Sequence, residues 1–98
     1  MSDVVVTDNP AQQRYEAHLD GRLAGFAEYL VTDELIAFTH TEVFPAFEGR
    51  GVGSALARAG LDAVRADGTR KVLPQCPFIA SWIGKHPDYQ DLVYGAKA

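Results

Sequence analysis

The stretch Phe47 to Leu56, FEGRGVGSAL, places three glycines at alternating positions around Arg50 and continues directly into a helical pattern. When each residue advances a helix by about 100°, the small and apolar residues of positions 51–66 fall on one half of the wheel and the charged residues on the other. The pattern predicts an amphipathic helix over residues 51–66. Unpaired N–H groups converge at a helix N-terminus, and the helix dipole favours negative charge there. The stretch therefore predicts an anion site that suits a pyrophosphate or a similar group.

Two common phosphate-binding patterns do not match this stretch. The P-loop ends in Gly-Lys-Ser/Thr, which is not present. The dinucleotide pattern GxGxxG fails in both registers, because counting from Gly49 and Gly51 puts Ser54 in the last place, and counting from Gly51 and Gly53 puts Leu56 there. ATP and NAD are therefore less expected as ligands. The alternative interpretation is that the glycines only form a tight turn and a close contact between helix and sheet.

The first half of the chain predicts antiparallel strands. Residues 15–19 alternate between apolar and polar before the Asp-Gly pair at positions 20–21, the strongest short hairpin signal. A second turn at residues 32–34 precedes LIAFTHTEVF, residues 35–44, whose β-branched and aromatic composition predicts a largely buried strand. Residues 4–6 are a possible first strand. A meander of three or four strands follows from these patterns.

The second half continues after the predicted helix with KVLPQC, a short strand that contains Pro74. Proline has no N–H to donate to a ladder, so this strand lies at an edge or parts from its neighbour near that point. Pro77 suits the first turn of a second helix, FIASWIGKH, which Pro87 ends. Residues 92–94 are a possible last strand. The order of elements predicts one α+β (mixed α/β) domain over residues 1–98.

Composition narrows the partners and the compartment. The chain has 98 residues and a net charge of −4, with no basic stripe to neutralise phosphodiesters, so nucleic acid is not an expected partner. One cysteine and three scattered histidines make neither an internal disulfide nor a metal cluster of the usual spacing. No apolar run approaches the roughly 20 residues of a membrane span, and the N-terminus lacks the regions of a signal peptide. We expect a soluble cytoplasmic protein that holds no metal.

The sequence EGRGVGSAL after the strand THTEVF resembles the acetyl-coenzyme A loop of the GNAT acetyltransferases, whose pattern is Gln/Arg-x-x-Gly-x-Gly/Ala. Glu48 stands at the first position of that pattern. With CPF and HPDYQDLV at their spacing, the second half is similar to the small single-domain Yjdj-type members, and the resemblance extends from Val4 to about Val93. It implies a compact GNAT-like fold, an antiparallel meander followed by β-α-β-α. The two central parallel strands would splay apart to admit the cofactor, which Pro74 suits.

The resemblance implies acetyl-coenzyme A as the cofactor. The pyrophosphate would be held by the backbone of six consecutive residues, namely Gly49, Arg50, Gly51, Val52, Gly53 and Ser54. The pantetheine arm would pair with the backbone of Val43 and Phe44, much as another strand would. Ser81 and Lys85, on the second helix, would approach the nucleotide.

Acetyl transfer from a thioester to an amine needs a neutral amine, a polarised carbonyl and sometimes an acid for the leaving thiolate. A backbone N–H near Val43 would polarise the carbonyl. His40 and Glu42 lie two apart on one face of a strand and are candidates for the base, directly or through one water. The alternative for His40 is a half-buried histidine hydrogen-bonded within the sheet. Cys76 is a candidate to protonate coenzyme A or to accept the acetyl group, or else a small buried hydrophobe.

Two main function classes follow. The first is an N-acetyltransferase that moves acetyl to an amine on a small molecule or a peptide, either a lysine or an N-terminus, acting as a monomer or a weak homodimer. The second is a non-catalytic module that binds acetyl-coenzyme A or coenzyme A. A third possibility, a cysteine hydrolase that uses Cys76 and His40, leaves the glycine loop without a purpose and ranks last.

Overall fold

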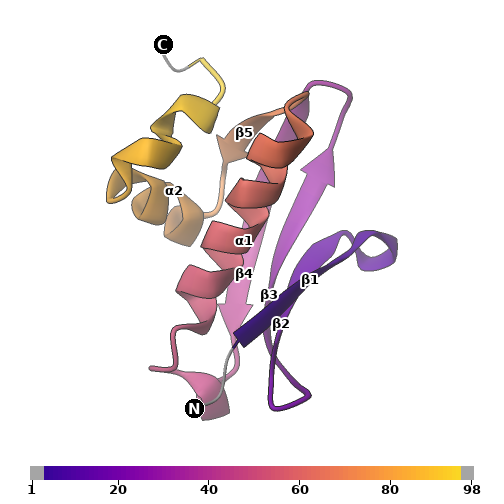
Figure 1. Ribbon diagram of the computed structural model, residues 1–98, viewed down its shortest axis with the longest axis vertical. Coiled ribbons are helices and arrows are strands. Elements are labelled where there is room, and N and C mark those ends of the chain that lie inside the picture. Colours follow the sequence, from indigo (N-terminus) through magenta and orange to yellow (C-terminus); the bar gives the residue numbers. More distant parts are fainter. Residues whose placement is uncertain (1–3, 96–98) are drawn as a thin grey trace.

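A five-stranded mixed sheet forms the centre of the computed structural model, which describes residues 4–95 (Figure 1). The strands lie in the order β1-β2-β3-β4-β5, and their bounds are Val4–Asn9, Arg14–Leu19, Arg22–Val31, Leu35–Val43 and Lys71–Pro74. The first four strands pair antiparallel, whereas β5 runs parallel to β4. The predicted α+β (mixed α/β) class with a GNAT-like order of elements is confirmed.

The β2–β3 hairpin forms as the sequence predicts. Tyr15, Ala17 and Leu19 are buried and alternate with partly exposed residues. Asp20 and Gly21 both have positive φ, 53° and 78°, which is the backbone that a two-residue type I′ turn requires. The alternation therefore sets which face of β2 enters the core.

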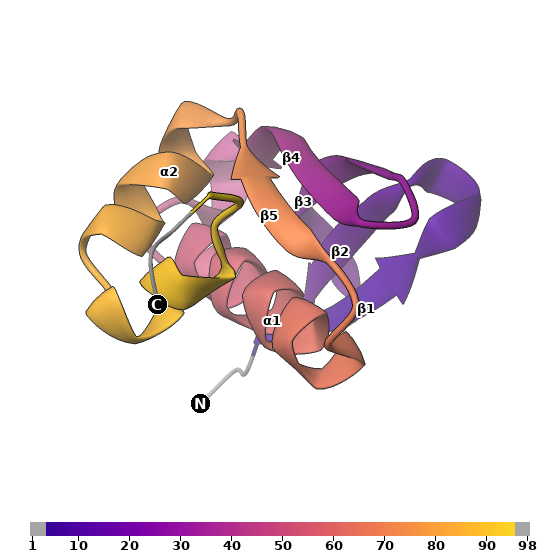
Figure 2. The same cartoon turned by 90° about the horizontal axis from the view of Figure 1, so that it is seen from above.

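Helix α1, Val52–Asp67, packs its apolar side against the sheet (Figure 2). Its buried residues are Val52, Leu56, Ala57, Gly60, Leu61 and Val64. A Cβ at Gly60 would lie 3.3 Å from the Phe38 ring, so glycine permits the close approach of α1 to β4. The predicted helix over residues 51–66 is confirmed to within one residue at each end, because Gly51 is the N-cap and Gly68 the C-cap.

The C-terminal segment differs from the prediction. Helix α2 covers Pro77–Gly84 and ends before His86, since the residue that precedes a proline disfavours helical backbone. A 3-10 helix, η3, Pro87–Leu92, follows and buries Tyr89 and Leu92, which are three residues apart. The predicted last strand at residues 92–94 is therefore wrong, and only one parallel bridge, Val72 to Val93, remains of it. Two further 3-10 turns, η1 Pro10–Gln12 and η2 Pro45–Phe47, were not predicted.

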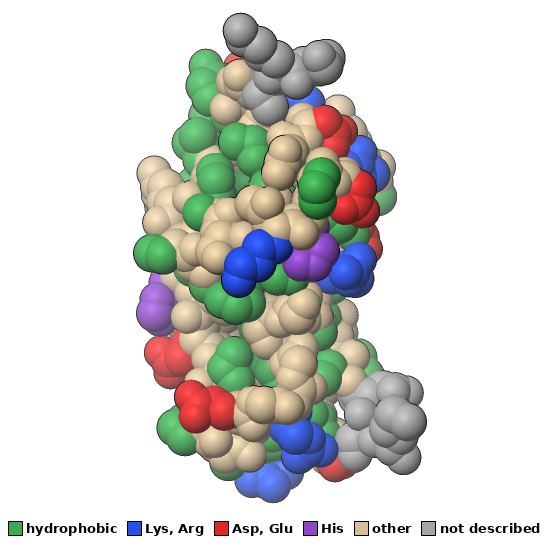
Figure 3. Space-filling model, turned by 90° about the vertical axis from the view of Figure 1, so that its left-hand side faces the viewer, with side chains coloured by type: hydrophobic (Ala, Val, Ile, Leu, Met, Phe, Trp, Pro, Cys, Tyr) green, Lys and Arg blue, Asp and Glu red, His purple; other side chains and the backbone are tan. Residues whose placement is uncertain are grey.

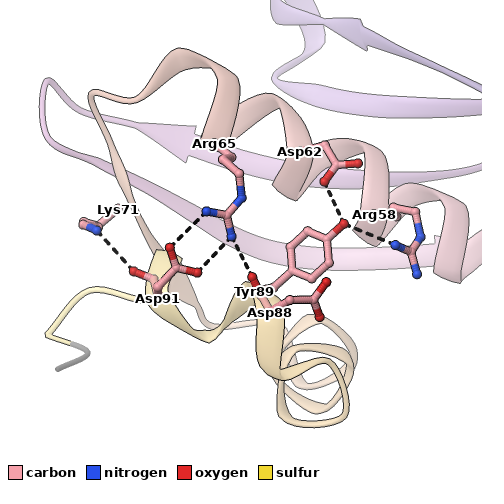
Figure 4. Close-up of polar contacts among 7 residues, drawn as sticks. All are labelled: Arg58, Asp62, Arg65, Lys71, Asp88, Tyr89 and Asp91. Carbon is pink, nitrogen blue, oxygen red and sulfur yellow. Dashed lines mark hydrogen bonds and ion pairs between the residues drawn. The ribbon is translucent and has the colours of Figure 1, made fainter. Parts of the chain in front are cut away.

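Polar contacts fasten η3 to α1 (Figure 4). Arg65 donates hydrogen bonds to both carboxylate oxygens of Asp91, at 3.0 and 2.9 Å. The Tyr89 hydroxyl donates to Asp62 at 2.7 Å and accepts from Arg58 at 3.2 Å. These contacts hold η3 along the side of α1.

The parallel pair β4–β5 is short and opens at Pro74. Residues 35–38 pair with residues 71–74, and the Cys76 N–H then donates to the Phe38 carbonyl at 2.8 Å. From Thr39 to Val43, β4 has no β5 partner among the described residues. The prediction for the proline strand is confirmed, because β5 is an edge strand of the sheet and parts from its neighbour at Pro74.

Candidate functional site

A pocket of about 420 Å³ lies where the glycine loop, the end of β4 and helix α2 meet. It is lined by Val43, Phe47, Glu48, Gly49, Gly51, Val52, Gly53, Ser54, Phe78 and Trp82. The structure thus brings together six of the ten predicted cofactor-binding residues. The other four do not line the pocket, and they are Phe44, Arg50, Ser81 and Lys85.

Glycine is favoured at each of the three loop positions for a local structural reason. Gly49 and Gly51 both have φ of +79°, a conformation that other residues rarely adopt. Gly53 has no positive φ, but a Cβ there would lie 2.9 Å from the Phe78 ring. The glycines therefore do form the tight turn and the close contact between helix and sheet that were the alternative to an anion site. Whether the loop can also bind an anion depends on which of its N–H groups have no hydrogen-bond acceptor.

Those N–H groups lie in the first turn of α1. The first helical hydrogen bond runs from the Ala55 N–H to the Gly51 carbonyl, so the preceding N–H groups have no acceptor within the helix. In the described chain no side chain caps this N-terminus, and no acidic residue occupies its first turn. The positive end of α1 therefore opens into the pocket with no side-chain cap, and Glu48, in the loop before the helix, is the acidic residue of the pocket lining.

Trp82 joins α2 to this N-terminus. Its Nε1 donates a hydrogen bond to the Ser54 hydroxyl at 2.9 Å, and the Arg58 guanidinium lies 5.3 Å from the centroid of its ring. Sequence analysis did not identify Phe47, Phe78 or Trp82 as site residues. The spacing of Phe78 and Trp82, four apart on one helix face, was the available signal.

The end of β4 offers one backbone donor to the opening beside β5. The Phe44 N–H is already used, because it donates to the Ala24 carbonyl of β3 at 2.9 Å. Successive N–H groups of a strand point to opposite edges, so the Val43 N–H points away from β3. Val43 is thus placed to pair with an extended ligand, whereas the Phe44 N–H is not.

The three catalytic candidates border the same opening from opposite faces of β4. Cys76 is buried, caps α2, and donates from Sγ to the Thr41 hydroxyl at 3.3 Å. His40 and Glu42 are exposed, with 3.3 Å between His40 Nε2 and Glu42 Oε1. Because side chains alternate along a strand, these two lie on the face opposite to Thr41. The structure therefore pairs His40 with Glu42 but does not bring either to Cys76, which argues against a cysteine hydrolase.

Tyr89 is not available as an acid for this pocket. Its hydroxyl is engaged by Asp62 and Arg58, and the hydrogen bond to Asp62, with burial, raises the pKa of Tyr89. Tyr89 comes from η3, and its hydroxyl points to Asp62 and Arg58 of α1, as Figure 4 shows. The residue joins two elements rather than serving the opening between β4 and β5.

Charged side chains around the pocket are few. Glu48 lines it, while Arg50 on the loop, Ser81 on α2 and Lys85 at the C-cap of α2 are exposed. Figure 3 shows the side of the molecule that carries α2, where charged side chains are scattered and do not gather into one basic patch. We expect an anion at the pocket to be held mainly by backbone N–H groups.

Two features are absent from residues 4–95, the part of the chain that the structure describes. No group of three or more His, Cys, Asp or Glu side chains in this range is arranged to hold a metal ion. None of its helices combines the length and the apolar character that crossing a membrane would need.

A mixed sheet with an opened parallel pair, followed by a glycine loop that leads into an uncapped helix, defines a GNAT-like fold. The chain matches the family model described as GCN5-related N-acetyl-transferase over residues 14–92, and it belongs to this family. The match runs from the first residue of β2 to the last residue of η3, so it includes every element that lines the pocket. No curated protein matches the chain at a significant level.

Proposed function

We propose that the chain is an N-acetyltransferase that takes acetyl from acetyl-coenzyme A and transfers it to an amine on a small molecule or a peptide. The observation that carries this proposal is the uncapped N-terminus of α1, which opens into a pocket of about 420 Å³ at the end of β4. The enzyme would act in the cytoplasm, where reducing conditions keep Cys76 a free thiol, as a monomer or a weak homodimer.

In this proposal the pyrophosphate of acetyl-coenzyme A accepts hydrogen bonds from the backbone of residues 49–54. The pantetheine arm runs along the free edge of β4, where the Val43 N–H is open. Arg50, exposed on the loop, folds over the phosphates, and Ser81 of α2 and Lys85, the C-cap of α2, contact the nucleotide.

The amine would arrive from the face of the sheet that carries His40 and Glu42. His40 accepts a proton from the amine, and the amine nitrogen attacks the thioester carbon, whose oxygen is polarised by the Val43 N–H. The new C–N bond forms and the C–S bond breaks. The coenzyme A thiolate then takes a proton from the Cys76 thiol.

The second candidate function is a module that binds acetyl-coenzyme A without turnover. One observation favours it, because Cys76 is 3% exposed and its thiol is already bonded to Thr41. Both functions share the cofactor and differ only in the transfer.

Release of coenzyme A thiol, measured with a panel of primary amines, lysine peptides and peptides with free N-termini, separates the two. Amine-dependent release supports the enzyme, and binding without release across the whole panel supports the module.

Gly51→Ala should raise the KM for acetyl-coenzyme A about tenfold, because alanine disfavours the left-handed backbone at that position. The matched control is Gly84→Ala, where an added Cβ meets nothing within 4 Å and no positive φ is involved. An unchanged KM in Gly51→Ala would contradict the proposed phosphate site.

A further inference from the structure

A second cavity, of about 390 Å³, lies at the other end of α1 from the glycine loop. It is enclosed by the last turns of α1, the start of β2 and the ends of β1 and β3, the upper end of α1 in Figure 1. Val52 lines the first pocket and Val64 the second, so the two sites are separated by roughly 18 Å along the helix axis. The cavity is therefore separate from the candidate cofactor site.

Tyr15 lines this cavity with a hydroxyl that no described residue hydrogen-bonds. Its side chain lines the cavity and the residue is 9% exposed, yet its hydroxyl makes no hydrogen bond with any residue from 4 to 95. The neighbouring Tyr29, whose ring centroid is 5.3 Å from that of Tyr15, donates its hydroxyl hydrogen to Asp8. Among the described residues no fully buried side-chain polar atom is left without a partner, so the Tyr15 hydroxyl reaches the solvent of the cavity. Its hydrogen-bond partner is then a water molecule or a polar group that displaces this water.

The charges around the cavity favour a cation. Asp8 and Asp67 both line it, and hydrogen bonds from Thr69 hold the pKa of Asp67 below its ordinary value, so this carboxyl is ionised. Arg70 is the one cation of the lining, and it is already engaged by the Thr32 carbonyl at 2.6 Å and by Asp67 at 3.6 Å. One negative charge is left in excess.

The tyrosines add to this preference. Burial, followed by the charges of Asp8 and Asp67, raises the pKa of Tyr15, so its phenol stays neutral and both carboxylates lie near its hydroxyl. The faces of aromatic rings attract cations. Ile36, Ala63 and Val64 form an apolar part of the same lining, which would accept an aliphatic chain.

We propose that this cavity binds a small aliphatic ammonium ion. The ammonium group donates hydrogen bonds to the Asp8 carboxylate and to the Tyr15 hydroxyl oxygen, and the aliphatic chain lies against Ile36 and Val64. The site does not depend on the proposed acetyl transfer, because no residue of its lining belongs to the cofactor pocket.

The test uses the whole chain and n-butylammonium chloride as the probe, with amide chemical shifts in a two-dimensional nitrogen–proton NMR spectrum as the readout. Saturable shifts are expected at Asp8, Tyr15 and residues 63–67, with no matching shifts at residues 49–54. Butyrate and 1-butanol have the same apolar chain without the positive charge, and they should give no saturable shifts at those positions.

Two variants test the contacts. Asp8→Asn keeps an oxygen for the Tyr29 hydroxyl but loses the charge, and it should weaken the binding of n-butylammonium about tenfold. Tyr15→Phe removes only the hydroxyl without a partner, so it should leave the melting temperature of the free protein unchanged or higher and weaken binding about threefold. Asp88→Asn is the charge-matched control outside the cavity and should bind as the parent does.

The proposal is overturned by an absence of saturable shifts around the cavity, by equal binding of butyrate, or by unchanged binding in Asp8→Asn. Since the readout needs neither acetyl-coenzyme A nor turnover, its failure would leave the proposed function standing, and failure of the proposed function would leave this site standing.

Discussion

Glu48 is the residue whose chemistry conflicts most with the proposed ligand. It lines the pocket beside the N-terminus of α1, where a carboxylate repels a pyrophosphate. Glu48→Gln should therefore tighten the binding of acetyl-coenzyme A about threefold, and more at low ionic strength, because the side chain is exposed and screened by salt. Titration calorimetry at two salt concentrations measures this.

The control for that experiment is Glu34→Gln, which makes the same change of charge in the turn between β3 and β4, outside the pocket lining. Equal tightening in both variants would attribute the effect to net charge. Weaker binding in Glu48→Gln would mean that the carboxylate helps to hold the cofactor.

Substitution of Cys76 tests whether acetyl transfer takes place at the opening between β4 and β5. If its thiol protonates the leaving coenzyme A, Cys76→Ala should lower kcat about a hundredfold with little change in the KM for acetyl-coenzyme A. Steady-state kinetics with the best amine of the panel measures both parameters. Thr41→Val, which removes only the acceptor of the thiol hydrogen bond, should retain most of the activity. A Cys76→Ala variant with full kcat and a lower melting temperature would assign the residue to the core instead.

Among the elements, η3 is held by its buried Tyr89 and Leu92 and by polar contacts to α1, and one of these contacts predicts a dependence on pH. The hydrogen bonds from Arg65 hold the pKa of Asp91 below its ordinary value of 3.8, so the folded state favours the ionised form. A depressed carboxyl pKa stabilises the fold above the ordinary value, and this contribution is lost as the pH falls through the folded pKa. Asp91→Asn should therefore melt at a lower temperature than the parent at pH 7, and the difference should shrink below pH 3.8.

Thermal melting from pH 7 down to pH 2.5 follows this difference. The control is Asp88→Asn, since Asp88 contacts Arg65 only through its backbone carbonyl. A difference between Asp91→Asn and the parent that stays constant across the whole range would show that the ion pair does not contribute through its charge.

The elements differ in how far the sequence predicts them. Helix α1 and the β2–β3 hairpin follow from local patterns. The helical periodicity of residues 51–66 predicts the helix, and the Asp20-Gly21 pair predicts the tight turn. The structure of the C-terminal segment does not follow from local patterns. Leu92 to Tyr94 read as a strand, but Tyr89 and Leu92 enter the core through a 3-10 turn that Asp62, Arg58 and Arg65 of α1 hold in place. That outcome depends on contacts between residues more than 20 positions apart.

The candidate site shows the same division. The glycines and the N–H groups after them are local to one stretch, so sequence predicts them well. Phe78 and Trp82 reach the pocket only because α2 packs beside α1, and the Phe44 N–H donates to β3 instead of facing the opening. The separation of Cys76 from His40 follows from which face of β4 each borders, which a bulge near Thr39 helps to set.

At the scale of the whole molecule, α1 connects two cavities. Its N-terminus opens into the pocket of the glycine loop, and its last turns line the cavity of Tyr15 and Asp67. The opposite ends of one helix dipole favour opposite charges, an anion at the first site and a cation at the second. The charge preferences proposed for the two sites agree with this orientation.

Titration of the purified chain with acetyl-coenzyme A tests whether the pocket at the N-terminus of α1 binds this cofactor. Trp82 is the single tryptophan and lines the pocket, so its fluorescence reports on that site alone, and calorimetry gives the heat of the same event. We expect saturable binding of acetyl-coenzyme A with a Kd in the micromolar range, a change in Trp82 emission, and no comparable response to ATP or NAD. If acetyl-coenzyme A produced neither heat nor a change in emission, the glycine loop would not be a site for this cofactor.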